Sequence, residues 1–298
     1  MLNIRIYLLG GIVTLKRRNK ILIILLCMFT LFSLAGCSKV DAAKVKLGLK
    51  NNDFEYIKQG KIKKIIIQNT RDQGFRFVVT DQRAISDLYD ILSSAKKVEE
   101  KSSLQPDYIF EMYEGTDKIY KFNYIVGLDK KEAGNLYSDD KIYVVSKRID
   151  NDIIKSFWNI RKPKDFTDVY YNSILKTLTE NSKDFGSNKT IGININDDID
   201  VLKFMLSTDL ENFNSQLNSK FKTAEIMEDN KKYDITMSII TQGYRTYYDS
   251  KSNLLADYKA IITINDSTDK SEKKYYIFDK YSEGKWDISI TKTKPDKF

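Results

Sequence analysis

The hydrophobic period of this chain alternates between that of strands and that of a helix, and this alternation restricts the fold more than any other feature. Between residues 61 and 166, the segments KIKKIIIQN and FRFVVTD are typical of strands, the second with Phe75, Phe77 and Val79 on one face. A helix pattern begins at Asp81 and Gln82. Its apolar residues recur every three or four positions and predict one buried stripe: Ile85, Leu88, Tyr89, Leu92 and Ala95.

Three further strands are predicted in DYIFEMYE, KIYKFNYIVG and KIYVVSK. A last helix is expected from about Asp150, and Pro163 lies beyond its end. This helix would turn inward Ile153, Ile154, Phe157 and Trp158. The order ββαβββα predicts antiparallel pairing with helices packed on one face.

A second unit is predicted from residue 167 to residue 298. A helix over 168–181 would bury Tyr171, Ile174, Leu175 and Leu178. KTIGININ is then a strand or an extended link. Another helix is expected to begin at Asp197, Asp198 and Asp200 and to carry a stripe of Ile199, Leu202, Leu206, Leu210, Phe213 and Leu217. Strands follow at about 221–229, 232–244, 255–266, 273–281 and 285–293, the last two joined by Ser282-Glu283-Gly284.

These patterns predict an α+β protein of two small domains, each an antiparallel sheet with packed helices. In the second unit, helices come first and a long, curved antiparallel sheet follows. This element order resembles the NTF2-like or cystatin-like arrangement, a likeness of order alone.

The amino-terminal region has the features of an export signal. The apolar run from Ile21 to Ala35 has 15 residues, which as a helix would span about 22 Å, short of the roughly 30 Å hydrocarbon core. A basic segment, Lys16 to Lys20, precedes the run, and small residues follow it. The pair Gly10-Gly11, a few residues before Leu15, is what the purine-rich tract of a ribosome-binding site would encode if it were translated. We therefore hypothesise that synthesis starts at an alternative start codon near residue 15.

Leu34-Ala35-Gly36-Cys37 resembles the lipobox of bacterial lipoproteins. The resemblance implies cleavage between Gly36 and Cys37 and a diacylglyceryl group on the Cys37 thiol. The predicted organisation is therefore a lipoprotein signal peptide (1–36), a lipidated amino terminus and tether (37–60), a first α+β domain (61–166) and a carboxy-terminal α+β domain (167–298). A core helix that contains Cys37, or an ordinary cleaved signal, is the alternative.

Removal of the signal changes the charge balance. The chain has 49 Lys and Arg and 41 Asp and Glu, but residues 1–36 hold five of the bases and no acid, so 44 bases remain against 41 acids. Nucleic-acid binding, which needs a basic surface, is therefore not expected. Cys27 would leave with the signal and Cys37 would carry lipid, so no disulfide is expected. Abundant Lys, Ile, Asn and Tyr suggest an AT-rich genome, and hence a Gram-positive host.

The segments PDYIFEMY, KIYKFNYIVG, SDDKIYVVSKRIDNDIIKSF and RKPKDF resemble the YhfM-like domain of lipoproteins from Bacillus and Clostridium relatives. The likeness covers about 105 residues, roughly a third of the chain. It implies a small α+β domain on a cell-surface lipoprotein. It brings no catalytic or ligand residue that can be carried over to this sequence.

Several chemistries are excluded by composition. The chain has no histidine, which removes the usual base of serine and cysteine hydrolases and the commonest zinc ligand. Neither GxxxxGK[ST] nor GxGxxG is present to hold a phosphate. A serine activated by lysine, or a pair of carboxylates, remains possible. No catalytic residue, cofactor or metal is predicted.

Two clusters are candidates for a site. Asn194 to Asp200 (NINDDID) is similar to a calcium loop, but Ile199 and Met205 stand where an EF-hand needs glycine and glutamate. We interpret these acids as a helix amino-terminal cap. The second cluster, Gln242 to Tyr248 (QGYRTYY), sets an arginine among tyrosines and suits protein or glycan recognition. The alternative is that these tyrosines only cover one face of a curved sheet.

The expected function is that of a non-enzymatic lipoprotein on the extracytoplasmic face of the cell membrane, held there by a diacylglyceryl anchor at Cys37. It would be an envelope binding or accessory module with an unknown partner. One alternative is sequestration of an antimicrobial peptide or another small amphipathic ligand by the second domain. Another is a wall hydrolase that uses carboxylates such as Glu111, Asp139 or Asp140.

Overall fold

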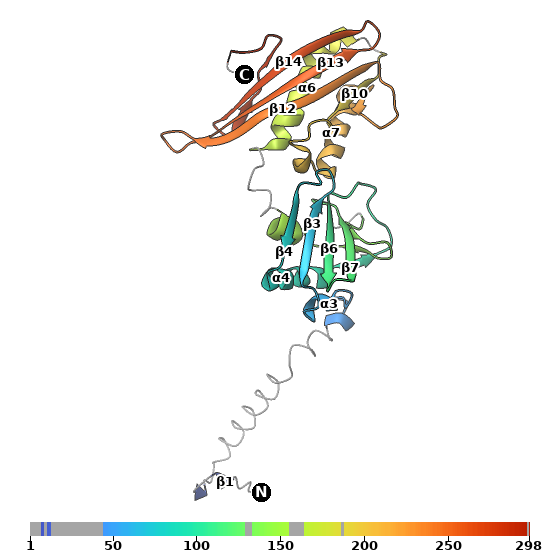
Figure 1. Cartoon of the computed structure of the whole chain (residues 1–298), viewed down its shortest axis with the longest axis vertical. Helices are drawn as coiled ribbons and strands as arrows, with labels where there is room; N and C mark the ends of the chain where they lie inside the picture. Colours follow the sequence, from blue (N-terminus) through green and yellow to red (C-terminus); the bar gives the residue numbers. More distant parts are fainter. Residues whose placement is uncertain are drawn as a thin grey trace. The chain divides into compact units, whose positions relative to one another are not determined.

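The computed structural model in Figure 1 describes residues 7–8, 11–12, 44–128, 133–154, 164–185, 188–296 and 298. The chain divides into two compact units, Met1–Asp53 and Phe54–Phe298. In the first unit, β1 (Tyr7–Leu8) pairs antiparallel with β2 (Gly11–Ile12). The apolar run, Gly36 and Cys37 lie outside the described residues. None of the helices in the described ranges combines the length and the apolar character that a membrane crossing requires.

The first sheet of the second unit has seven strands and follows the helix α3 (Glu55–Lys58). Its order is β4-β3-β6-β7-β8-β9-β5, and each neighbouring pair is antiparallel. The strands are β3 (Lys64–Asn69), β4 (Arg76–Val79), β5 (Lys96–Val98), β6 (Tyr108–Glu114), β7 (Lys118–Tyr124), β8 (Leu136–Tyr137) and β9 (Ile142–Val144). The five predicted strands are confirmed, while the short β5 and β8 were not predicted.

The helix α4 (Gln82–Ser93) begins where the sequence predicts, because Asp81 caps it. The Asp81 carboxylate accepts hydrogen bonds from the N–H groups of Arg83 and Ala84, at 3.0 and 2.9 Å. Its apolar stripe is buried in the core of the first sheet: Ile85, Leu88, Tyr89, Ile91 and Leu92. A π-helix, η1 (Ile149–Ile154), lies where the sequence predicts the last helix of the first α+β domain (61–166). Phe157 and Trp158, which were expected to turn inward on that helix, lie outside the described residues.

The core of the first sheet extends into the segment expected to be a tether. Phe54 and Ile57 are buried there, and the Phe54 ring lies 5.1 Å from the Tyr143 ring and 5.6 Å from the Phe122 ring. Aromatic pairs at such distances add to the free energy gained by burial. The range 37–60 therefore contains packed residues from Phe54 onward.

The second sheet is mixed. Its path is β11-β10-β12-β13-β14-β15, with β16 also paired to β14. The strands are β10 (Ile191–Asn194), β11 (Ala224–Ile226), β12 (Ile235–Tyr248), β13 (Leu254–Asp266), β14 (Ser271–Ser282), β15 (Lys285–Asp287) and β16 (Ile290–Thr291). β10 runs parallel to both β11 and β12. A helical crossover separates β10 from β11 along the chain, and such a connection lets the two strands run in the same direction.

The helix α6 (Phe166–Phe185) packs against one face of the long strands β12, β13 and β14, which run side by side in Figure 1. Alternate residues of the strands face this core, as the two-residue period requires: Ile235, Met237, Ile239, Tyr258, Ala260, Ile262, Tyr275 and Ile277. The opposite face of the strands carries the candidate site. The predicted α+β fold with two sheet-containing domains is confirmed, and the second sheet is mixed rather than wholly antiparallel.

The helix predicted from Asp197 begins ten residues later. The chain instead forms the short 3-10 helix η2 (Leu202–Phe204), an extended step at Met205 and Leu206, and then α7 (Ser207–Lys220). The Asp198 carboxylate is buried and accepts hydrogen bonds from the Thr241 N–H and hydroxyl, at 3.1 and 2.7 Å. Because Asp198 bonds to β12 instead of to the following N–H groups, the interpretation of these acids as the helix cap was wrong.

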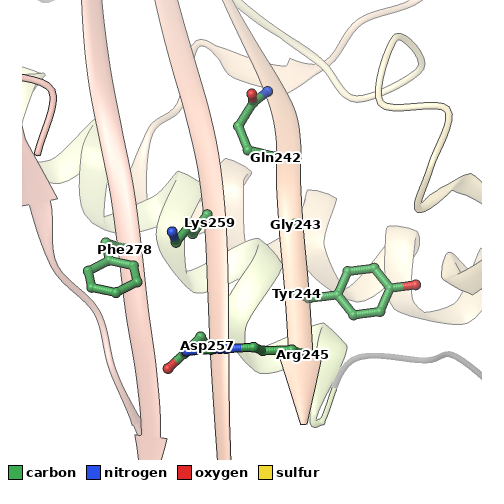
Figure 2. Close-up of a pocket in the computed structure, with 7 residues that line it drawn as sticks. All are labelled: Gln242, Gly243, Tyr244, Arg245, Asp257, Lys259 and Phe278. Atoms are coloured by element: carbon green, nitrogen blue, oxygen red, sulfur yellow. The ribbon is translucent and has the colours of Figure 1, made fainter. Parts of the chain in front are cut away.

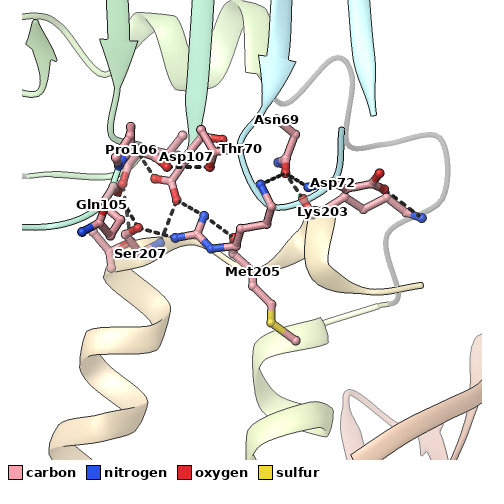
Figure 3. A network of polar contacts seen from close by, with 12 residues as sticks. Asn69, Thr70, Asp72, Gln105, Pro106, Asp107, Lys203, Met205 and Ser207 are labelled. Carbon is pink, nitrogen blue, oxygen red and sulfur yellow. Dashed lines mark hydrogen bonds and ion pairs between the residues drawn. The ribbon is translucent and has the colours of Figure 1, made fainter. Parts of the chain in front are cut away.

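The start of α7 is held by a residue from the first sheet. The Ser207 N–H donates to Asp107 Oδ1 at 2.8 Å, and Arg71 Nη1 donates to the same oxygen at 2.7 Å (Figure 3). The Val126 N–H donates to Asp107 Oδ2 at 2.8 Å. A carboxylate at a helix amino terminus is favoured by the helix dipole. Burial nevertheless raises the pKa of Asp107, against the lowering effect of Arg71.

Candidate functional site

The Gln242–Tyr248 segment forms the last part of β12, where an irregularity shifts the register. The pairing with β13 shifts between Thr241 and Gly243, as in a β-bulge. Beyond the shift, Gly243 stands opposite Lys259 and Arg245 stands opposite Asp257. Bulges re-aim the side chains of a strand and often occur beside functional sites.

Residues of three neighbouring strands line a groove at this position (Figure 2). Its volume is about 420 Å³, and we call it the β12–β14 groove. Its lining comprises Gln242, Gly243, Tyr244, Arg245, Asp257, Lys259 and Phe278. Because the lining comes from three strands that are paired with one another, the sheet fixes the spacing of these side chains.

An ion pair spans the groove between β12 and β13. Arg245 Nε and Nη2 lie 2.7 and 2.6 Å from Asp257 Oδ2. The Tyr247 hydroxyl donates to Asp257 Oδ1 at 3.3 Å, and the Arg245 guanidinium lies 4.9 Å from the centre of the Tyr247 ring. Asp257 raises the pKa of Arg245 by accepting its hydrogen bonds. The Asp257 side chain is 8% exposed and that of Arg245 is 71% exposed, so the guanidinium is presented to solvent.

A lysine and an aromatic ring form the other side of the groove. Lys259 Nζ lies 5.1 Å from the centre of the Phe278 ring, and Lys280 Nζ lies 5.3 Å from the same ring. Cations at this distance from an aromatic face are attracted to it. The groove therefore combines cationic donors with an apolar surface.

The tyrosines of the segment do not share one surface. Tyr244 packs towards the core, with its ring 6.1 Å from that of Phe204, and Figure 2 shows it pointing away from Asp257 and Lys259. Tyr247 and Tyr248 are exposed, and Tyr248 has 69% of its surface open to solvent. The segment thus contributes both to the core and to an exposed surface, so its tyrosines do not all cover one face of the sheet, and its binding role stays a prediction.

The structure does not assemble a metal site from the Asn194–Asp200 segment. Asn194 Nδ2 donates to Asp197 Oδ2 at 2.6 Å, while Asp198 is bonded to Thr241. Across the described ranges, no group of three or more Cys, Asp or Glu side chains is arranged to hold a metal ion.

The three carboxylates considered for a hydrolase make separate local contacts. Glu111 lies in β6 and accepts a hydrogen bond from the Tyr113 hydroxyl at 2.9 Å. Asp139 and Asp140 lie between β8 and β9, where the Ser138 hydroxyl donates to Asp140 at 2.8 Å. The hydrogen bonds and ion pairs of the described residues do not join Glu111 to either aspartate.

Sequence reasoning missed Asp257, Lys259 and Phe278 as members of the site. Their alternation with buried residues marks them as facing away from the core, but the register of β12, β13 and β14 is what brings them beside Arg245. A shift of one residue in this register would have turned them to the other face.

Residues 58–163 match the family model described as YhfM protein. No curated protein and no solved structure matches the chain. The NTF2-like or cystatin-like arrangement therefore stays a prediction. The β12–β14 groove lies outside the matched residues, whereas the first sheet lies within them. Residues 58–163 form a YhfM-like domain.

Proposed function

We propose that this protein is an extracytoplasmic lipoprotein, anchored to the cell membrane through Cys37, that acts as a non-enzymatic binding or accessory module of the envelope. The β12–β14 groove is its recognition site in this proposal. The observation that carries the proposal is the placement of Arg245, Lys259 and Phe278 on the solvent face of one sheet. Convergent polar groups beside an apolar surface are typical of binding sites.

The anchor is supported by the sequence of Leu34 to Cys37 and by the basic and apolar segments before it. Each buried methylene of an acyl chain contributes about 0.8 kcal/mol, so two or more chains would retain the protein at the membrane. Retention would keep the groove close to ligands at the cell surface, whether an envelope protein or a small amphipathic molecule.

Of the alternatives, ligand sequestration uses the same groove and differs only in the fate of the ligand. The hydrolase has less support, because Glu111 and the two aspartates make separate local contacts. Hydrolysis by a carboxylate pair requires the two groups on opposite sides of one bond, several ångströms apart.

Membrane fractionation and crosslinking in intact host cells test this proposal. Cys37→Ala removes the proposed lipid acceptor, and Cys27→Ala is the matched control, because Cys27 lies in the apolar run ahead of the cleavage position. We expect wild type and Cys27→Ala in the membrane fraction with the same crosslinked envelope molecule. Cys37→Ala should be released or accumulate as a longer precursor, without that product. A Cys37→Ala protein that is processed and retained normally would contradict the proposal.

A further inference from the structure

The β12–β14 groove has a net positive lining. Arg245 and Lys259 each carry one positive charge and Asp257 one negative charge, while the other residues of the lining are uncharged. Lys280 stands beside the groove, opposite Asp257 in the register of β13 and β14. A cationic ligand would meet repulsion from three side chains, whereas an anionic ligand would be attracted.

The one carboxylate of the lining is already engaged. Both oxygens of Asp257 accept hydrogen bonds within the protein, Oδ2 from Arg245 and Oδ1 from the Tyr247 hydroxyl. These contacts also hold the Arg245 guanidinium in place, so less conformational entropy is lost when a ligand binds it. Arg245 can still present its outer face to a ligand because most of the side chain is exposed.

Gly243 leaves the space that a ligand would occupy. A Cβ atom added at Gly243 would meet no heavy atom within 4 Å. Gly243 stands directly opposite Lys259 in the register, so this open space borders the Lys259 side of the groove. A larger side chain at this position is therefore expected to extend into the groove.

We propose that the β12–β14 groove binds an anionic group carried on an apolar or aromatic body. The anion would lie between Arg245 and Lys259, and the apolar part would contact the Phe278 ring. Guanidinium and ammonium groups both bind phosphate and carboxylate oxygens through charge-assisted hydrogen bonds. This inference rests on the proposed function and narrows its ligand class, since it disfavours cationic antimicrobial peptides.

Phenyl phosphate is the probe, because it carries a phosphate on a single ring. Its binding is measured by calorimetry on the full chain in phosphatidylcholine nanodiscs, with empty nanodiscs subtracted. Phenyltrimethylammonium has the same ring with the opposite charge, and inorganic phosphate has the charge without the ring. We expect saturable binding of phenyl phosphate, about tenfold weaker binding of inorganic phosphate, and none of phenyltrimethylammonium. Equal binding of the two ring compounds would overturn the inference.

Two substitutions locate the binding in the groove. Gly243→Leu fills the space, and Lys259→Gln removes one cation. Their matched controls lie on the same face of the sheet: Asn265→Leu, six residues beyond Lys259 on β13 and about 20 Å away, and Lys274→Gln on β14. We expect each groove variant to lower the affinity for phenyl phosphate about tenfold and each control to leave it unchanged. Unchanged affinity in a folded Lys259→Gln protein would contradict the inference.

Phosphatidylglycerol vesicles distinguish two sources of the anion. If they displace phenyl phosphate, the ligand is a lipid headgroup; if they do not, it is a soluble anion. The binding experiment does not depend on Cys37. If phenyl phosphate does not bind, the proposed ligand class is contradicted, but the proposed lipid anchor is not. Conversely, a normally retained Cys37→Ala protein would remove the anchor and leave the binding chemistry intact.

Discussion

Two arginine–aspartate pairs in this protein have nearly the same length and a buried aspartate each, but they differ in the exposure of the arginine. Arg71 Nη1 lies 2.7 Å from Asp107 Oδ1, and Arg245 Nη2 lies 2.6 Å from Asp257 Oδ2. The Arg71 side chain is 16% exposed and the Arg245 side chain is 71% exposed. The distance between the charges therefore does not distinguish the two pairs, but the remaining contacts of each arginine do.

Arg71 directs its other hydrogen bonds into the protein. Nη1 also donates to the Met205 carbonyl at 3.2 Å, and Nη2 donates to the Ser207 hydroxyl (Figure 3). In the part of the chain that the structure describes, Arg245 bonds to Asp257 and packs on the Tyr247 ring, both on its own sheet, and it lines a groove. We infer that the first pair maintains the fold and that the second prepares a surface for a ligand.

The largest expected effect follows from breaking the buried pair. Asp107→Ala leaves the Arg71 guanidinium without its carboxylate and leaves the N–H groups of Val126 and Ser207 without their acceptor. Removal of one partner from a buried ion pair costs about 3–5 kcal/mol. Urea unfolding at neutral pH should show a loss of this size.

Asp140→Ala is the control for this measurement, because Asp140 is exposed and accepts a hydrogen bond only from Ser138 among the contacts described. It should change the free energy of unfolding by less than about 0.5 kcal/mol. If Asp107→Ala and Asp140→Ala are equally stable, the structural role of the Arg71 pair is wrong.

Asp279 is a buried carboxylate whose hydrogen-bond partners are uncharged. It can be compared with Asp107, the buried carboxylate that is paired with Arg71. The Ser173 hydroxyl lies 2.8 Å from Asp279 Oδ2, and the Ser289 N–H donates to Oδ1 at 3.0 Å. Burial raises the pKa of Asp279 to about 7. The Ser173 oxygen also lies within hydrogen-bond distance of the Val169 carbonyl, and one hydroxyl proton cannot serve both acceptors. A protonated Asp279 can donate to Ser173, which then donates to Val169.

The pKa of Asp279 is raised above its value of 3.8 in the unfolded chain, so the folded state holds a proton that the unfolded state has released. The stabilisation by protonated Asp279 is therefore present at low pH. As the pH rises from roughly 4 to 7, the free energy of unfolding should fall by about 2–4 kcal/mol. Asp279→Asn cannot titrate, so its urea unfolding should lack this loss and exceed wild type in stability at pH 8. An identical pH dependence in wild type and Asp279→Asn would exclude the assignment.

The sequence predicts those elements whose signals are local. Asp81 predicts the start of α4 because its side chain caps the helix in the structure as well. The alternation along β12 and β13 predicts long strands with one buried face. In both cases the residues that define the element lie close together in the chain.

The failures involve partners distant in the chain. Asp198 had the sequence context of a helix cap, but Thr241 supplies its donors, and α7 is held at Ser207 by Asp107. The groove likewise depends on the shift of register near Gly243, which no local pattern reports. Arg245 belonged to a candidate segment in the sequence because of its tyrosine neighbours, whereas Lys259 and Phe278 join it only through strand pairing.

Of the two arginine variants, Arg245→Gln is expected to have the smaller effect on stability, and it provides the most direct test of the division between the two pairs. Thermal unfolding and phenyl phosphate affinity are measured in the same samples of wild type, Arg71→Gln and Arg245→Gln. Arg71→Gln should lose about 3–5 kcal/mol of stability. Arg245→Gln should lose less than about 1 kcal/mol, because the Arg245 guanidinium is largely exposed, but its affinity should fall about tenfold. Unchanged affinity in Arg245→Gln, or a loss of stability equal to that of Arg71→Gln, would contradict the account.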